Sequence, residues 1–125
     1  MGVDLSVDVG VGFIIDPDAF MNYRKTVPDE ENYADQELLD DIVEGIPDFR
    51  HGTGGSYYDS GESNQSWIAI SRLTQHYGGH DIPGGVIGLN KPTITLAERE
   101  GLNAIAKKLG QPEPIIGQFM SVLWH

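Results

Sequence analysis

Two histidines and an aspartate lie close together in the chain, at His76, His80 and Asp81. Histidines four positions apart can bind one metal ion when both sit on the same helical turn. Gly78 and Gly79 lie between them, and glycine weakens a helix. We therefore expect no cofactor. A small metal-dependent enzyme or ligand-binding protein that adds His51 to these three residues is kept as an alternative.

Carboxylates dominate one stretch of the sequence. Nine acidic residues and no lysine or arginine lie from Asp29 to Asp48. On a helix, residues three, four and seven positions apart share a face, and like charges at this spacing cost a few tenths of a kcal/mol per pair. A fold that keeps such pairs either presents a negative surface to a basic partner or uses the charge only to remain soluble. The acids that meet this spacing are Glu37, Asp40, Asp41 and Glu44.

Two adjacent tyrosines, Tyr57 and Tyr58, interrupt the turn-rich segment 48–66. On a strand, neighbouring side chains point to opposite faces, so at least one of the two is expected at the surface. Exposed aromatic side chains are enriched at protein interfaces. We therefore add both tyrosines to the predicted partner-binding surface.

The glycine-rich segments carry no complete nucleotide or nucleophile motif. The sequence Gly10-Val11-Gly12 lacks the third glycine of a dinucleotide loop, and Asp16 and Asp18 would repel phosphate at the next helix. The segment 51–56 lacks the Lys-Ser/Thr ending of a P-loop and contains no nucleophile elbow. No catalytic residue is predicted.

Charge and composition exclude several classes of protein. The 125 residues include 19 Asp and Glu against 8 Lys and Arg, for a net charge of -11. This charge opposes direct binding to nucleic acid or to an anionic membrane. Zero cysteine excludes disulfides and thiolate sites and fits the cytoplasm. No apolar run is long enough to span a membrane, and the length suits one domain over 1–125.

The hydrophobic spacing predicts the elements that position these residues. Strict alternation predicts a strand over 3–15 with one buried and one solvated face, and a capping box at Thr95 and Glu98 starts a helix. That helix is expected over 96–109. A helix at 17–25 is expected to be capped by Asp16, to have Pro17 in its first turn and to end near Arg24. The other predicted elements are a helix at 29–45 and strands at 48–51, 55–59 and 66–72.

Two segments stay ambiguous. A helix through Tyr77 competes with the strand at 66–72, because Ile70, Leu73 and Tyr77 also fit a helical face. The tail, 114–124, has apolar residues at i, i+1, i+4 and i+5 and also many strand formers. We favour a helix for the tail, and a strand over the same residues is the close alternative.

The order β-α-α-β-β-α-(α or β) predicts an α+β fold. It would have a small mixed or antiparallel sheet and three to four helices packed on one face. The function we expect is that of a non-enzymatic module that binds a basic protein surface, such as that of a nucleic-acid-binding protein. In broad composition the chain is similar to phage-encoded accessory proteins and inhibitors. A structural or assembly protein is a further alternative.

Overall fold

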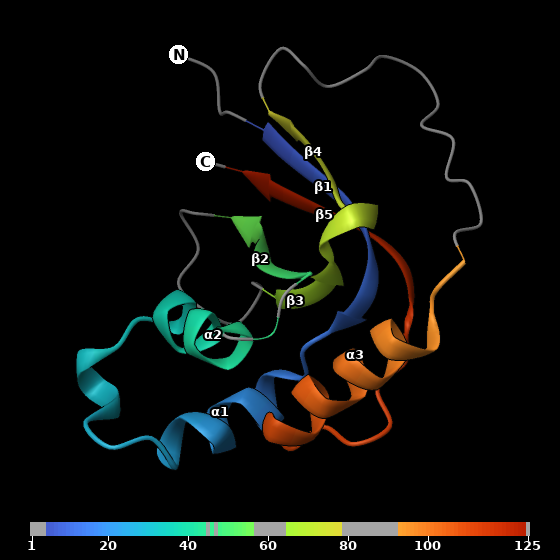
Figure 1. Ribbon diagram of the computed structural model, residues 1–125. Coiled ribbons are helices and arrows are strands. Elements are labelled where there is room, and N and C mark those ends of the chain that lie inside the picture. Colours follow the sequence, from blue (N-terminus) through green and yellow to red (C-terminus); the bar gives the residue numbers. More distant parts are fainter. Residues whose placement is uncertain (1–4, 45, 47, 57–64, 79–92, 125) are drawn as a thin grey trace, which may run out of the picture.

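The structure is a computed structural model that describes residues 5–44, 46, 48–56, 65–78 and 93–124. It has a mixed five-stranded sheet and three α-helices, which confirms the predicted α+β class (Figure 1). The elements are β1 (Leu5–Ile14), α1 (Pro17–Lys25), the 3-10 turn η1 (Glu30–Asn32), α2 (Asp35–Val43), β2 (Phe49–Ser56), β3 (Gln65–Ile70), the 3-10 turn η2 (Ser71–Leu73), β4 (Gln75–Gly78), α3 (Leu96–Lys108) and β5 (Gly117–Trp124).

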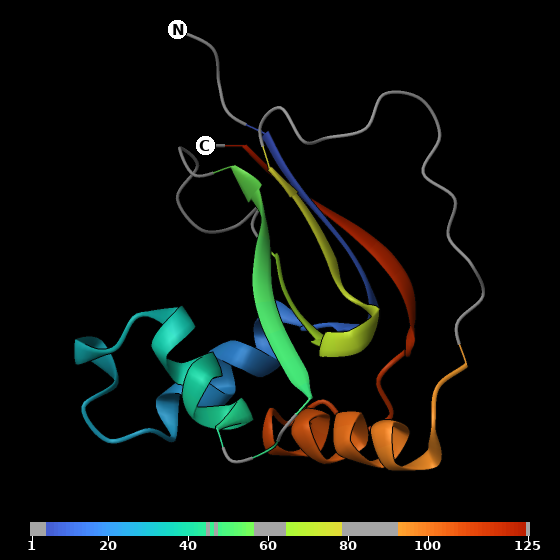
Figure 2. The same cartoon turned by 45° about the horizontal axis from the view of Figure 1, so that its top comes forward.

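Strand β1 organises the sheet. On one side it pairs antiparallel with β5, and on the other with β4 near its start and with β3 near its end. Strand β3 also pairs with β2, and β2 meets β5 in parallel where Gly55 lies beside Leu123. The strands β1, β5, β2 and β3 therefore form a closed ring, and their strong curl is visible in Figure 2.

Both faces of β1 are buried, so the predicted solvated face is wrong. Val11 and Phe13 pack in the main core beneath the helices. Gly10 and Gly12 are buried on the opposite face, and a Cβ atom at Gly10 would lie 3.0 Å from the ring of Phe119. The alternation of apolar and polar residues predicted the helix-facing side of β1 correctly. The other side is buried because the sheet closes into a ring and this side faces the inside of the ring.

Two aromatic rings fill the inside of the strand ring. The centroids of Trp67 on β3 and Phe119 on β5 lie 5.2 Å apart. The strands around them carry glycine: a Cβ atom at Gly52 would lie 2.7 Å from Cε2 of Trp67. The abundance of glycine in this chain therefore makes room for two large rings inside a small barrel.

The three helices lie together at one end of the sheet (Figure 1). Helix α1 begins as predicted, with Asp16 accepting a hydrogen bond from the amide of Asp18 and Pro17 in the first turn. Helix α3 also begins as predicted, at a complete capping box. The buried residues of this core are Val11, Phe13, Ile15, Leu39, Ile42, Ile68, Ile70, Leu102, Ile105, Ala106 and Leu109.

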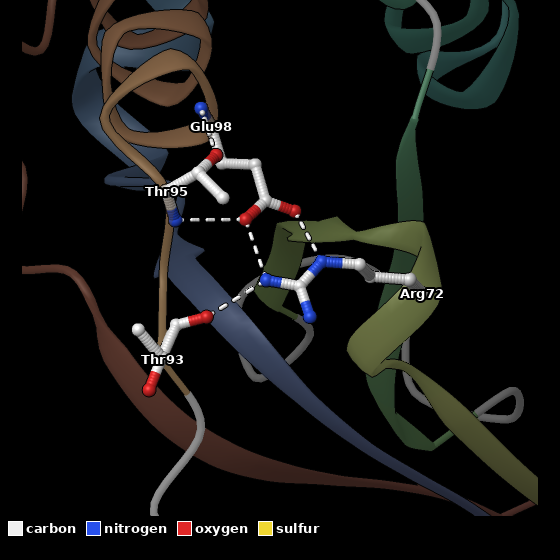
Figure 3. A network of polar contacts seen from close by, with 4 residues as sticks. All are labelled: Arg72, Thr93, Thr95 and Glu98. Carbon is white, nitrogen blue, oxygen red and sulfur yellow. Dashed lines mark hydrogen bonds and ion pairs between the residues drawn. The ribbon is translucent and has the colours of Figure 1, made fainter.

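An arginine fastens the start of α3 to the sheet (Figure 3). Arg72, on η2, donates two hydrogen bonds to the carboxylate of Glu98, at 2.6 and 2.7 Å, and one to the carbonyl oxygen of Thr93. The same carboxylate accepts the amide of Thr95. The hydrogen bond from Arg72 lowers the pKa of Glu98 to about 2. The capping box and the ion pair thus share one side chain.

Three predictions need correction, and one alternative is decided. The tail is not helical: β5 runs from Gly117 to Trp124, because β1 offers a full-length antiparallel partner. The predicted strand at 66–72 is confirmed as β3, and the alternative helix through Tyr77 does not form: η2 and β4 follow instead, and β4 pairs with β1. The predicted helix 29–45 splits into η1 and α2. The predicted strands at 48–51 and 55–59 merge into β2 as far as Ser56, and residues 57–59 lie outside the described part of the chain.

Candidate functional site

The predicted acidic side chains lie together on the outside of α2. Glu37, Asp40 and Asp41 belong to the helix, Glu44 is its C-cap residue, and all four are exposed. The side chains of Leu38, Leu39 and Ile42 are buried on the other side of the helix. We call the four carboxylates the acidic face.

Two carboxylates of α2 have partners within the chain itself. Asp35, in the first turn of α2, forms an ion pair with Arg24 of α1. Nε2 of His51, on β2, lies 2.5 Å from Oδ1 of Asp40. No ion pair among the described residues involves Glu37, Asp41 or Glu44. Three carboxylates of the acidic face are therefore available to an outside partner.

Helix α2 lacks the terminal features that stabilise the other two helices. Its N-cap residue, Ala34, makes no side-chain capping hydrogen bond, and its last turn contains no basic residue. Helices α1 and α3 have capped N-termini and basic residues in the last turn. Carboxylates near the C-terminus of α2 oppose the helix dipole. Burial of its apolar side, rather than its charges, therefore holds α2 in place.

The negative potential of the acidic face extends to α1. Burial raises the pKa of the Tyr23 hydroxyl above its usual value, and the charge of Asp41 raises it further. Tyr33, just before α2, is 40% exposed. An exposed aromatic side chain at the start of α2 is a feature common at protein interfaces.

The histidines do not form a metal site in the part of the chain that the structure describes. His51 pairs with Asp40, while Nδ1 of His76, on β4, lies 2.7 Å from Oδ1 of Asp8 on β1. Among the described residues, no group of three metal-binding side chains comes together. The remaining site candidates, His80, Asp81, Tyr57 and Tyr58, lie outside the described residues.

Sequence reasoning missed two side chains that contact the carboxylates of α2. Arg24 was predicted only as the end of the helix 17–25, and His51 only as a metal ligand. Both reach α2 through the tertiary fold, across 11 residues of chain in each case. Tyr33 was also missed, because it lies outside any periodic apolar pattern. A search for cations close in sequence to the acidic stretch would have suggested Arg24.

No family model, no curated protein and no solved structure matches this chain. In the described part of the chain, no helix is both long and apolar enough to cross a membrane. The assignment of function therefore depends on the residues and their geometry.

Proposed function

We propose that the protein is a non-enzymatic binding module that presents the acidic face of α2 to a basic surface on another protein. The observation that carries this proposal is the contrast between α2 and the other two helices. Uncapped and without a cation in its last turn, α2 keeps Asp40, Asp41 and Glu44 near a C-terminal end that they do not stabilise. Negative charge held at a cost in helix stability is consistent with selection for an external contact.

The partner we expect is a protein whose basic surface normally contacts nucleic acid phosphates. Exposed carboxylates on one rigid helix would compete with phosphates for the same lysines and arginines, and so act as an inhibitor of the phage-encoded accessory type. Electrostatic attraction would accelerate encounter and make binding weaker at high salt. We place this encounter in the cytoplasm, because the chain contains no cysteine.

Two variants of equal net charge test the proposal. Glu37→Lys with Asp41→Lys reverses two charges of the acidic face. Glu100→Lys with Glu113→Lys reverses two exposed charges elsewhere, on α3 and after it. Each immobilised protein is exposed to an extract of the native host, and the bound proteins are eluted with increasing salt.

The expected result is a basic protein captured by wild type and by the second variant, lost from the first, and released by salt. Equal capture by both double variants, or capture insensitive to salt, would contradict the role of the acidic face.

A further inference from the structure

A hollow with a volume of about 370 Å³ lies between α1 and α3. In both ribbon views the last turn of α3 lies beside α1 (Figures 1 and 2). The buried residues Ala19 of α1 and Leu109, the C-cap residue of α3, line the hollow. Three exposed polar residues also line it, Asn22 of α1 and Lys107 and Lys108 in the last turn of α3. We call this hollow the basic groove.

The charge of the basic groove is opposite to that of the chain as a whole. Two of the eight lysines and arginines line it, and none of the described residues that line it is acidic, although the chain has 19 Asp and Glu. Lys107 and Lys108 form no ion pair with any residue that the structure describes, and neither does Lys25, exposed in the last turn of α1. These cations are therefore available to an anionic group of another molecule.

Helix α1 separates the basic groove from the acidic face. On the side of α2, Arg24 of α1 forms an ion pair with Asp35. Tyr23 lines the basic groove, and its hydroxyl, whose pKa is raised by burial, is also affected by the charge of Asp41. Packed helices lie about 8–10 Å apart, and an interface of standard size buries about 800 Å² on each partner. A protein that binds the acidic face is therefore large enough to reach the basic groove as well.

We propose that the basic groove binds an acidic side chain that lies beside the basic surface of the same partner. This inference rests on the proposed function and narrows the class of partner to proteins whose basic surface is bordered by a carboxylate. A uniformly basic surface would bring its cations against Lys107 and Lys108, and like charges in contact weaken binding. The ammonium groups of the two lysines and the amide of Asn22 are donors for a carboxylate. One negative and one positive surface side by side also fix the orientation of the partner.

Three labelled peptides test this inference by fluorescence anisotropy with the full chain. The first alternates lysine and arginine. The other two add a pair of glutamates through a flexible glycine spacer, at the N-terminus or at the C-terminus. Long-range attraction to a chain of net charge -11 alone predicts that the glutamates weaken binding. We expect at least one glutamate-bearing peptide to bind wild type about threefold tighter than the first peptide. Weaker binding of both overturns the inference.

Matched variants locate the contact with the carboxylate. Lys107→Gln with Lys108→Gln should abolish the gain from the glutamates, and should bind the first peptide at least as tightly as wild type, because the variant is more acidic. Arg50→Gln with Arg99→Gln has the same net charge and should keep the gain, since these exposed arginines lie outside the lining of the basic groove. A gain that survives in the lysine variant, or is lost equally in the arginine variant, overturns the assignment to the basic groove.

The first peptide separates this inference from the proposed function. Its binding depends on the acidic face, so it should bind wild type and should be lost with Glu37→Lys and Asp41→Lys. If it does not bind wild type, or binds this variant equally, the proposed function and the role of the basic groove are both wrong. If it binds as expected and the glutamates only weaken binding, the role of the basic groove alone is wrong.

Discussion

Gly12 and Gly117 lie opposite each other in the pairing of β1 with β5, but only one of the two positions is closed to a side chain. A Cβ atom at Gly12 would lie 2.8 Å from Cα of Ala69, and closer still to the carbonyl oxygen of Ile68. A Cβ atom at Gly117 would have no neighbour within 4 Å. The close approach of β1 to β3 thus requires glycine at position 12.

We expect Gly12→Ala to destabilise the protein by about 3 kcal/mol or more, because backbone atoms of β3 would have to move. Gly117→Ala is the matched control and should be neutral or stabilise the fold by up to about 1 kcal/mol, since it restricts the unfolded chain. Urea denaturation followed by circular dichroism measures both changes. Similar losses for the two variants would show that the strand ring is not closed at Gly12.

The fit between Gly52 and Trp67 predicts an energetic coupling. Gly52→Ala should cost about 2 kcal/mol in the wild-type background, because the new methyl group meets the indole ring. In a Trp67→Phe background the same change should cost at least about 1 kcal/mol less, since the smaller ring leaves space.

Trp67→Phe alone should cost less than the loss of a hydrogen-bonded indole, because the buried Nε1 of Trp67 has no hydrogen-bond partner among the residues that the structure describes. A double-mutant cycle measured by chemical denaturation gives the coupling. Additive effects would contradict the packing of Trp67 against β2.

The ion pair of Arg72 with Glu98 predicts a pH dependence. The pKa of Glu98 is about 2 in the folded protein, below the ordinary value of 4.5 that applies to the unfolded chain. The ion pair therefore stabilises the fold fully above about pH 4.5, and this contribution is lost as the pH falls toward 2. Arg72→Ala should therefore lower the urea midpoint clearly at neutral pH. The difference from wild type should shrink steadily below about pH 4.5.

Arg99→Ala provides the control for Arg72→Ala. Arg99 is exposed on α3 and forms no ion pair with any residue that the structure describes. Its substitution should change the urea midpoint little, and equally at all pH values. A difference between Arg72→Ala and wild type that stays constant down to about pH 3 would exclude Glu98 as the titrating partner.

The capping box of α3 can be tested with two threonines. The hydroxyl of Thr95 accepts the amide of Glu98, so Thr95→Ala should cost about 1 kcal/mol. Thr93 contributes only its main-chain carbonyl oxygen to the same network, so Thr93→Ala should cost almost nothing. Thermal unfolding of the two variants compares them directly, and equal melting temperatures would contradict the capping role of Thr95.

The predictable parts of this fold are those determined by local chemistry. Asp16 with Pro17, and Thr95 with Glu98, marked the starts of two helices correctly, because a cap is specified within a few residues. The tail was misassigned, because its apolar spacing suits a helix and only a distant partner, β1, makes it a strand. The burial of Gly10 and Gly12 follows from ring closure, which is a relation between strands that local alternation does not contain.

The candidate site was also predictable only where it depends on local spacing in the sequence. Helical spacing placed Glu37, Asp41 and Glu44 on one exposed side, as the structure has them. The pairing of Asp40 with His51 depends on how α2 packs against β2, and no local pattern in the sequence encodes it.

The central position of β1 has a consequence for how the chain reaches its native state. Strand β1 pairs with residues 117–124 along one edge and with residues between 67 and 78 along the other. During synthesis the valines of β1 stay unpaired until the strands far downstream in the sequence have been translated. Such long-range pairing slows folding and prolongs the time during which folding intermediates expose apolar surface and can aggregate. We therefore expect productive folding to begin late, after translation of β5, and to benefit from chaperones that shield the waiting strand.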